Sequence, residues 1–119
     1  MYLPSRKFWV SLLALVSIFS VARADQCAWN VTISSTDCLA GQSDWLIIVS
    51  GTRMNPLNGS LKIFCHGHEV SDTAAGVSCT SVEWTKYYVV QASGGHNIEV
   101  KLMEGTTQRA SSSANQSCS

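Results

Sequence analysis

Apolar and polar side chains alternate in the segment Asn97-Ile98-Glu99-Val100-Lys101-Leu102-Met103, which carries the clearest structural signal in the sequence. In an extended chain, the side chains of Ile98, Val100 and Leu102 point to one face and those between them to the other. Such alternation predicts a strand that is buried on one side. Gly94-Gly95, shortly before this stretch, permits the tight turn of a hairpin.

Five further segments carry strand patterns, and no window holds a helical apolar period long enough to form a helix. The segment 27–34 alternates, 45–49 is continuously apolar, and 61–65, 77–84 and 87–92 are apolar or rich in β-branched and aromatic residues. Turns or loops are expected between them, at 55–59 and 72–76 among others. Six short strands, about ten residues apart, predict a small all-β sandwich or barrel.

The first 24 residues predict a secretory signal peptide. Arg6 and Lys7 precede the apolar run 8–21, and Ala22-Arg23-Ala24 has the small residues of a cleavage site. The run is too short to cross a bilayer as a helix, which takes roughly 20 residues. We therefore expect a secreted, extracellular protein that starts at Asp25.

The expected mature chain is mildly acidic. Residues 25–119 keep five Lys or Arg and eight Asp or Glu, which gives a formal charge of −3. Nucleic acids and anionic membranes both require a clustered basic face. We therefore expect no nucleic-acid partner and no membrane partner.

The cysteines predict a disulfide-stapled domain. Five cysteines lie in the expected mature chain, at positions 27, 38, 65, 79 and 118. The simplest monomer has two bridges and one free thiol, for which the sequence leaves about 15 pairings open. Cys65 shares a face with Leu61 and Ile63, so it is the candidate for a free, buried thiol. An intermolecular bridge through Cys65 is the alternative.

Chemistry for catalysis or cofactor binding is weakly represented. Cys65-His66-Gly67-His68-Glu69 is the densest group of potential ligands, and His66 and His68 would share one side of a strand. Cys65 would face away from them by alternation, and a closed zinc site needs about four ligands. There is no G-x-S-x-G motif and no evident Ser-His-Asp arrangement. We expect no metal, no cofactor and no enzyme activity.

Three sequons predict N-glycosylation, at Asn30, Asn58 and Asn115. Their expected places are the polar face of a strand, a turn and the Ser-rich tail. All three places are sterically accessible for the attachment of a glycan. Among the aromatic residues, alternation predicts that one of Tyr87 and Tyr88 is exposed, as is typical of protein contacts.

The chain resembles the MAX effectors of plant-pathogenic fungi, in particular their chlorosis-inducing toxin-like members. The likeness rests on Thr36-Asp37-Cys38-Leu39-Ala40-Gly41, on Leu46-Ile47-Ile48-Val49 and on the closing Cys118. It implies a six-stranded antiparallel β-sandwich of two three-stranded sheets, strands one, two and six in one and three to five in the other. This domain would cover residues 25–105, followed by a tail, 106–119, that is tied down only by Cys118.

The resemblance also implies the bridges Cys27–Cys79 and Cys38–Cys118, which leave Cys65 free. It implies a monomeric, non-catalytic virulence effector that binds a host protein, outside host cells or after translocation into them. Strand addition at a sheet edge is an economical way to bind. If the second strand is such an edge, Ser50, Thr52 and Arg53 are the expected contact residues.

Two other classes of protein stay open. A secreted immunoglobulin-like adhesion or structural module would normally have seven strands and a bridge between sheets near a buried Trp. A small protease inhibitor would instead need an exposed, cleavable loop, for which 54–58 is the candidate.

Overall fold

The computed structural model describes residues 27–119, so the expected signal peptide, 1–24, lies outside the described residues. The described part contains seven β-strands: β1 (Asn30–Ala40), β2 (Trp45–Met54), β3 (Ser60–Cys65), β4 (His68–Ala74), β5 (Val82–Val90), β6 (Gly94–Glu104) and β7 (Thr107–Cys118). From residue 27 onward there is no helix with the length and apolarity needed to cross a membrane.

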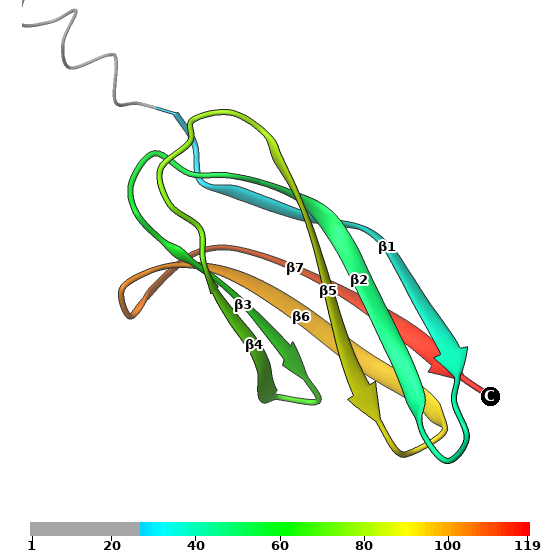
Figure 1. Cartoon of the computed structure of the whole chain (residues 1–119). Coiled ribbons are helices and arrows are strands. Elements are labelled where there is room, and N and C mark those ends of the chain that lie inside the picture. Colours follow the sequence, from blue (N-terminus) through cyan, green and yellow to red (C-terminus); the bar gives the residue numbers. More distant parts are fainter. Residues whose placement is uncertain (1–26) are drawn as a thin grey trace, which may run out of the picture.

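The strands form two antiparallel sheets that pack face to face (Figure 1). One sheet has the order β1-β2-β5 and the other the order β4-β3-β6-β7. The prediction of an all-β, disulfide-linked sandwich is confirmed. The predicted six strands in two sheets of three are wrong, because seven strands divide into three and four. The grouping of the sixth predicted strand with the first two is also wrong, since β6 pairs with β3 and β7.

Two strands differ from their predicted bounds. β5 is one continuous strand across the predicted break at 85–86, because Thr85 and Lys86 pair with Ser50 and Val49 of β2. β4 occupies part of the predicted loop 72–76. It is an end strand with little burial, so its sequence carries no apolar alternation.

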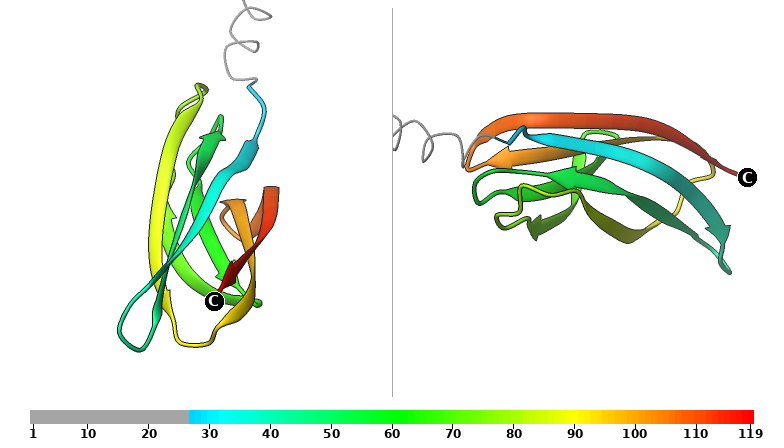
Figure 2. Two further views of the ribbon diagram at one scale, coloured as in Figure 1. Left: turned by 90° about the vertical axis from the view of Figure 1, so that its right-hand side faces the viewer. Right: turned by 90° about the horizontal axis from the view of Figure 1, so that it is seen from above.

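The predicted Ser-rich tail is strand β7, which pairs with β6 along its whole length. Thr107 lies opposite Glu104 at one end, and Cys118 lies opposite Gly94 at the other. β7 also lies along β1 of the other sheet (Figure 2). The hydroxyl of Ser112 accepts a hydrogen bond from the Ile33 amide at 3.1 Å, and the Thr36 hydroxyl donates to the Gln116 side-chain oxygen at 2.7 Å. Small polar side chains suit the middle of β7, because it meets β1 there through hydrogen bonds, while Ala110 and Cys118 pack against the core.

The core lies between the two sheets. Its fully buried side chains come from the inner faces of the central strands β2, β3 and β6, and they include Ile47, Val49, Ile63, Ile98, Val100 and Leu102. The alternation that predicted residues 97–103 as a strand is thus the pattern of β6, whose inner face fills the centre of the sandwich.

Two disulfides lie at opposite ends of the sandwich, and one of them joins strands of the two sheets. Cys38, near the end of β1, is bonded to Cys118 at the end of β7, and Cys27, before β1, is bonded to Cys79 in the β4–β5 loop. These are the pairs that the resemblance implies. Cys65 is free and buried.

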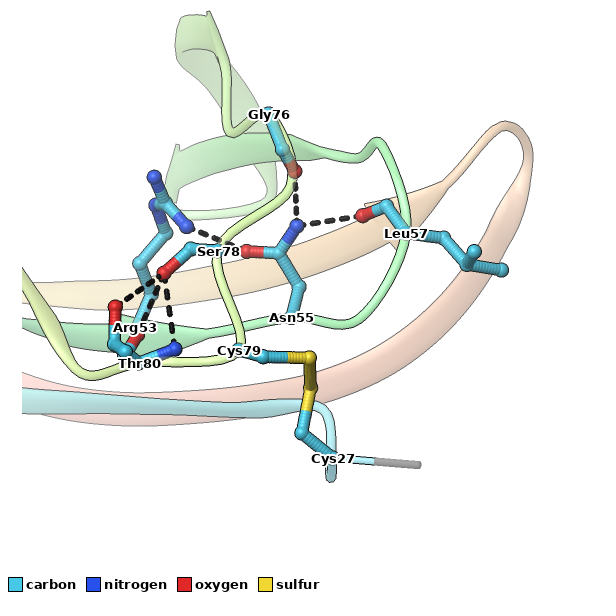
Figure 3. The surroundings of a disulfide bond; sticks show 8 residues. All are labelled: Cys27, Arg53, Asn55, Leu57, Gly76, Ser78, Cys79 and Thr80. Atoms are coloured by element: carbon cyan, nitrogen blue, oxygen red, sulfur yellow. Dashed lines mark hydrogen bonds between the residues drawn. A yellow bond between two sulfur atoms is a disulfide. The ribbon is translucent and has the colours of Figure 1, made fainter. Parts of the chain in front are cut away.

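Asn55 holds together the loops around the Cys27–Cys79 bridge (Figure 3). It is fully buried, and its side-chain amide donates to the carbonyl oxygens of Leu57, at 2.6 Å, and Gly76. Its side-chain oxygen accepts from the Arg53 guanidinium, and its backbone carbonyl accepts from the Cys79 amide at 3.0 Å. One side chain thereby ties the β2–β3 loop to the β4–β5 loop.

Candidate functional site

The outer face of the three-stranded sheet carries an apolar patch, the most evident candidate for a contact surface. Strand register places Leu39, Leu46 and Val89 in one row across β1, β2 and β5. Ile48 and Tyr87 lie in the next row. We call these five residues the apolar patch. The exposed fractions are 48% for Leu39, 58% for Val89 and 64% for Tyr87, which is high for large apolar side chains.

The patch continues to an open sheet edge. β5 is an end strand, and no other strand of the described part hydrogen-bonds to its outer side. The opposite edge of the same sheet, β1, is covered by β7 and by the Cys38–Cys118 bridge. Backbone groups of an uncovered edge are free to pair with another chain. The sheet therefore offers one edge, next to the patch, where a partner strand could add.

The acidic side chains Asp37 and Glu83 are the charged groups on this face in the described part. Asp37 lies in the row of Ile48 and Tyr87, and Glu83 lies further along β5. Lys86 is the basic residue of β5, and alternation turns it to the inner face, where it is half-buried. The charged groups nearest to the apolar patch on this face of the described part are therefore both negative.

The predicted contact residues Ser50, Thr52 and Arg53 do not lie on an edge. Their strand, β2, is the central strand of its sheet, with β1 on one side and β5 on the other, so the expectation that it is an edge is wrong. Ser50 and Thr52 instead line a shallow hollow of about 220 Å³ on the outer face. Arg53 binds Asn55 within the molecule. The continuous apolar run of β2 puts apolar residues on both of its faces. Such a run is typical of a central strand and could have indicated that β2 has no free edge.

The three sequon asparagines are exposed and lie away from the apolar patch. Asn30 is on β1 opposite Met54, nine residues from Leu39, which is about 30 Å along an extended strand. Asn58 is in the β2–β3 loop, and Asn115 is on the outer face of the other sheet, opposite Asn97. Glycans at all three positions would leave the patch accessible.

A second group of reactive side chains lies at the β3–β4 turn. The ligand atoms of Cys65, His66 and His96 all lie within 4.8 Å of one another. The expectation that Cys65 faces away from its neighbouring histidine is wrong. His66 has a φ of 50°, in the left-handed region, so strand alternation ends at this residue. His96 is brought in from β6, where Ile98 pairs with Cys65.

The two imidazoles of this group contact each other directly. His66 Nε2 and His96 Nδ1 are 3.2 Å apart, and His96 Nε2 is 2.8 Å from the carbonyl oxygen of Ala92. His96 is buried, whereas His66 is exposed. His68, the expected partner of His66, is exposed on β4 and does not belong to the group.

The hydroxyl of Tyr88 lies beside this group. It is buried and has no hydrogen-bond partner among the described residues, although the Cys65 thiol is its neighbour. Burial raises the pKa of Tyr88 above its ordinary value, and the Cys65 thiol raises it further. The phenol therefore stays protonated and can act as a donor at neutral pH. The prediction that one of Tyr87 and Tyr88 is exposed is confirmed, with Tyr87 outside and Tyr88 inside.

The sequence matches no protein-family model and no curated protein sequence. The structure is similar to a solution NMR structure of a CARDB domain from Pyrococcus furiosus, with a TM-score of 0.52 and 12% sequence identity. The match covers 75% of this chain and 92% of that domain. At this identity the likeness defines the fold alone. The chain is thus a small β-sandwich similar to a CARDB domain, with two disulfides of the kind that persist in oxidising, extracellular surroundings.

Proposed function

We propose that this protein is a secreted, non-catalytic binding module that acts on a protein of a host organism. The observation that carries the proposal is the apolar patch beside the open edge of β5. A single exposed apolar residue is ordinary, but five apolar residues in two adjoining rows, three of them exposed, are typical of a protein-contact surface. Tyr87, on the edge strand β5, is of a residue type enriched among binding hot spots.

The partner that fits this surface is an extended protein segment that adds to β5 as a fourth strand. Backbone hydrogen bonds to the free edge would supply affinity, and alternate side chains would supply specificity. Apolar residues of the segment would meet Val89 and Tyr87. A basic residue further along the segment would suit Glu83, which lies on β5 four residues from Tyr87.

The role in virulence is supported by the resemblance to MAX effectors and by the bridge pattern that it implies. The seven strands do not support membership of that family, whose sandwich has six. Binding at β5 replaces the contact expected at Ser50, Thr52 and Arg53, because β2 has no free edge. The predicted secretion is tested by the mass of the protein released by a secreting cell, which is expected to begin at Asp25.

The binding surface is tested by two matched double substitutions. Tyr87→Ser with Val89→Ser removes the two exposed patch residues of the edge strand β5 itself and is expected to weaken binding by about 10- to 100-fold, because a hot spot contributes about 1–2 kcal/mol or more. The partner is first identified by photo-crosslinking from position 87, and its affinity is then measured as a purified protein by calorimetry.

The control is Leu57→Ser with Val77→Ser, which likewise replaces two exposed large side chains by serine, at residues that are 50% and 61% exposed in the loops at the other end. This pair is expected to leave the affinity unchanged. Equal losses for the two pairs, or no crosslink from position 87, would contradict the proposal.

An immunoglobulin-like adhesion or structural module is the second candidate, because seven strands in sheets of three and four match that class in number. The differences are that β4 pairs with β3 and that neither bridge joins β2 to β6. Such a module would bind a second copy of itself. Sedimentation would then show a dimer that the Tyr87→Ser/Val89→Ser pair dissociates.

A further inference from the structure

We propose that Cys65, His66 and His96 form a zinc-binding site. One thiol and two imidazoles converge where the β3–β4 turn meets the start of β6, with all ligand atoms within 4.8 Å of one another. This assignment is independent of the proposed function, because the site lies between the sheets and the turn and shares no residue with the apolar patch.

The spacing of the two imidazoles fits one ion. Zinc binds imidazole nitrogen at about 2.0–2.1 Å in tetrahedral geometry, which places two ligand nitrogens about 3.3 Å apart. His66 Nε2 and His96 Nδ1 are 3.2 Å apart. A zinc-bound thiolate lies about 3.6 Å from the ligand nitrogens, and the Cys65 sulfur lies within 4.8 Å of both imidazole nitrogens.

The hydrogen bonds of His96 direct a lone pair at His66, whose Nε2 proton a bound ion would replace. The carbonyl oxygen of Ala92 can only accept, so the proton of His96 is on Nε2, which lies 2.8 Å from that oxygen. Nδ1 is then unprotonated and directed at His66. A ligating histidine whose other nitrogen donates to a backbone carbonyl is the usual outer arrangement of a metal site.

The buried hydroxyl of Tyr88 supplies a second, independent observation. It has no hydrogen-bond partner among the described residues, and an unpartnered buried donor is costly. A zinc-bound thiolate at Cys65 would be a charged acceptor beside it. Metal binding thus satisfies a polar group that is otherwise left without a partner.

The donor set selects the metal. Thiolate and imidazole ligands without a carboxylate favour zinc over calcium or magnesium. Three protein ligands leave a fourth position for water, and His66 is exposed, so an ion can enter from solvent. Zinc has no redox chemistry and therefore leaves the thiol reduced.

The proposal is tested with the purified, disulfide-bonded protein and Co²⁺ as a spectroscopic substitute for zinc. We expect one equivalent of Co²⁺ to bind, with the thiolate charge-transfer band and the intense visible bands of a tetrahedral site, and zinc to displace it. Cys65→Ala is expected to abolish the charge-transfer band. Circular dichroism verifies that this variant remains folded.

Two histidine variants form a matched pair. His66→Ala removes an exposed ligand and is expected to weaken zinc binding at least tenfold, whereas His68→Ala removes an exposed imidazole two residues away and is expected to change nothing. Absence of the charge-transfer band in the unmodified protein, or equal zinc affinities for the two variants, would overturn the assignment and leave His66 and His96 as a hydrogen-bonded pair that binds no metal.

Discussion

Replacing Cys38 and Cys118 together by alanine is expected to lower the free energy of unfolding by about 4 kcal/mol. The bridge joins residues that are 80 positions apart, and the chain-entropy model assigns about 4–5 kcal/mol to closing a loop of this length. A domain of this size has about 5–10 kcal/mol of stability in total. Urea denaturation of the double variant measures this loss of free energy. The midpoint temperature of thermal unfolding is expected to fall by about 15–30 °C.

Two comparisons show whether the loss comes from the bridge. The Cys27→Ala/Cys79→Ala variant opens the other bridge, with a separation of 52, and is expected to lose a similar free energy of unfolding. Cys65→Ala removes a buried thiol that is in no bridge, and its loss is expected to be much smaller. If the first variant lost less than about 1 kcal/mol, β1 and β7 would be held by their noncovalent contacts alone.

Asn55→Asp is expected to destabilise the protein by about 3–5 kcal/mol, although it only replaces the side-chain NH2 group by an oxygen and leaves the side-chain volume nearly unchanged. The amide nitrogen that donates to Leu57 and Gly76 becomes an oxygen that can only accept, so two carbonyl oxygens face a buried carboxylate. Arg53 remains as a partner for that charge, which offsets part of the cost.

Urea denaturation as a function of pH tests this explanation. The deficit is expected to shrink as the pH falls, because the protonated carboxyl group regains one donor and loses its charge. Asn97→Asp, the same change at an exposed position, is the control and is expected to stay within about 0.5 kcal/mol of the parent protein. A deficit that did not depend on pH would argue against the lost donors as its cause.

The strands that could be predicted from the sequence are those that have one face buried in the core. β3 and β6 carry clean alternation because each has one apolar face, and the same alternation placed Cys65 on the buried side. β4 and β7 were missed for the opposite reason. Both are end strands of their sheet, and β7 meets β1 through side-chain hydrogen bonds, so neither needs an apolar face.

The candidate sites were harder to predict, because each depends on contacts between distant segments. The exposure of Tyr87 follows from alternation, but its neighbours Leu39 and Leu46 join it only through the register of three strands. The Cys65–His66–His96 group was missed because the side-chain alternation of a strand was assumed to continue through His66, where the backbone in fact turns. Gly67 directly follows His66, at the point where the sequence changes from apolar to polar residues, and this pattern indicated a turn.

The placement of the two bridges at opposite ends of the sandwich has a mechanical consequence. A force that pulls the chain apart between Cys27 and Cys118 is carried along β1 only as far as Cys38 and then passes through the bridge to Cys118. The segment from 27 to 38 extends to about 40 Å, whereas the whole chain from 27 to 118 would extend to about 300 Å. Strands β2 to β7 therefore bear no tension, and the face with the apolar patch can lose one strand, β1, but not its central strand β2.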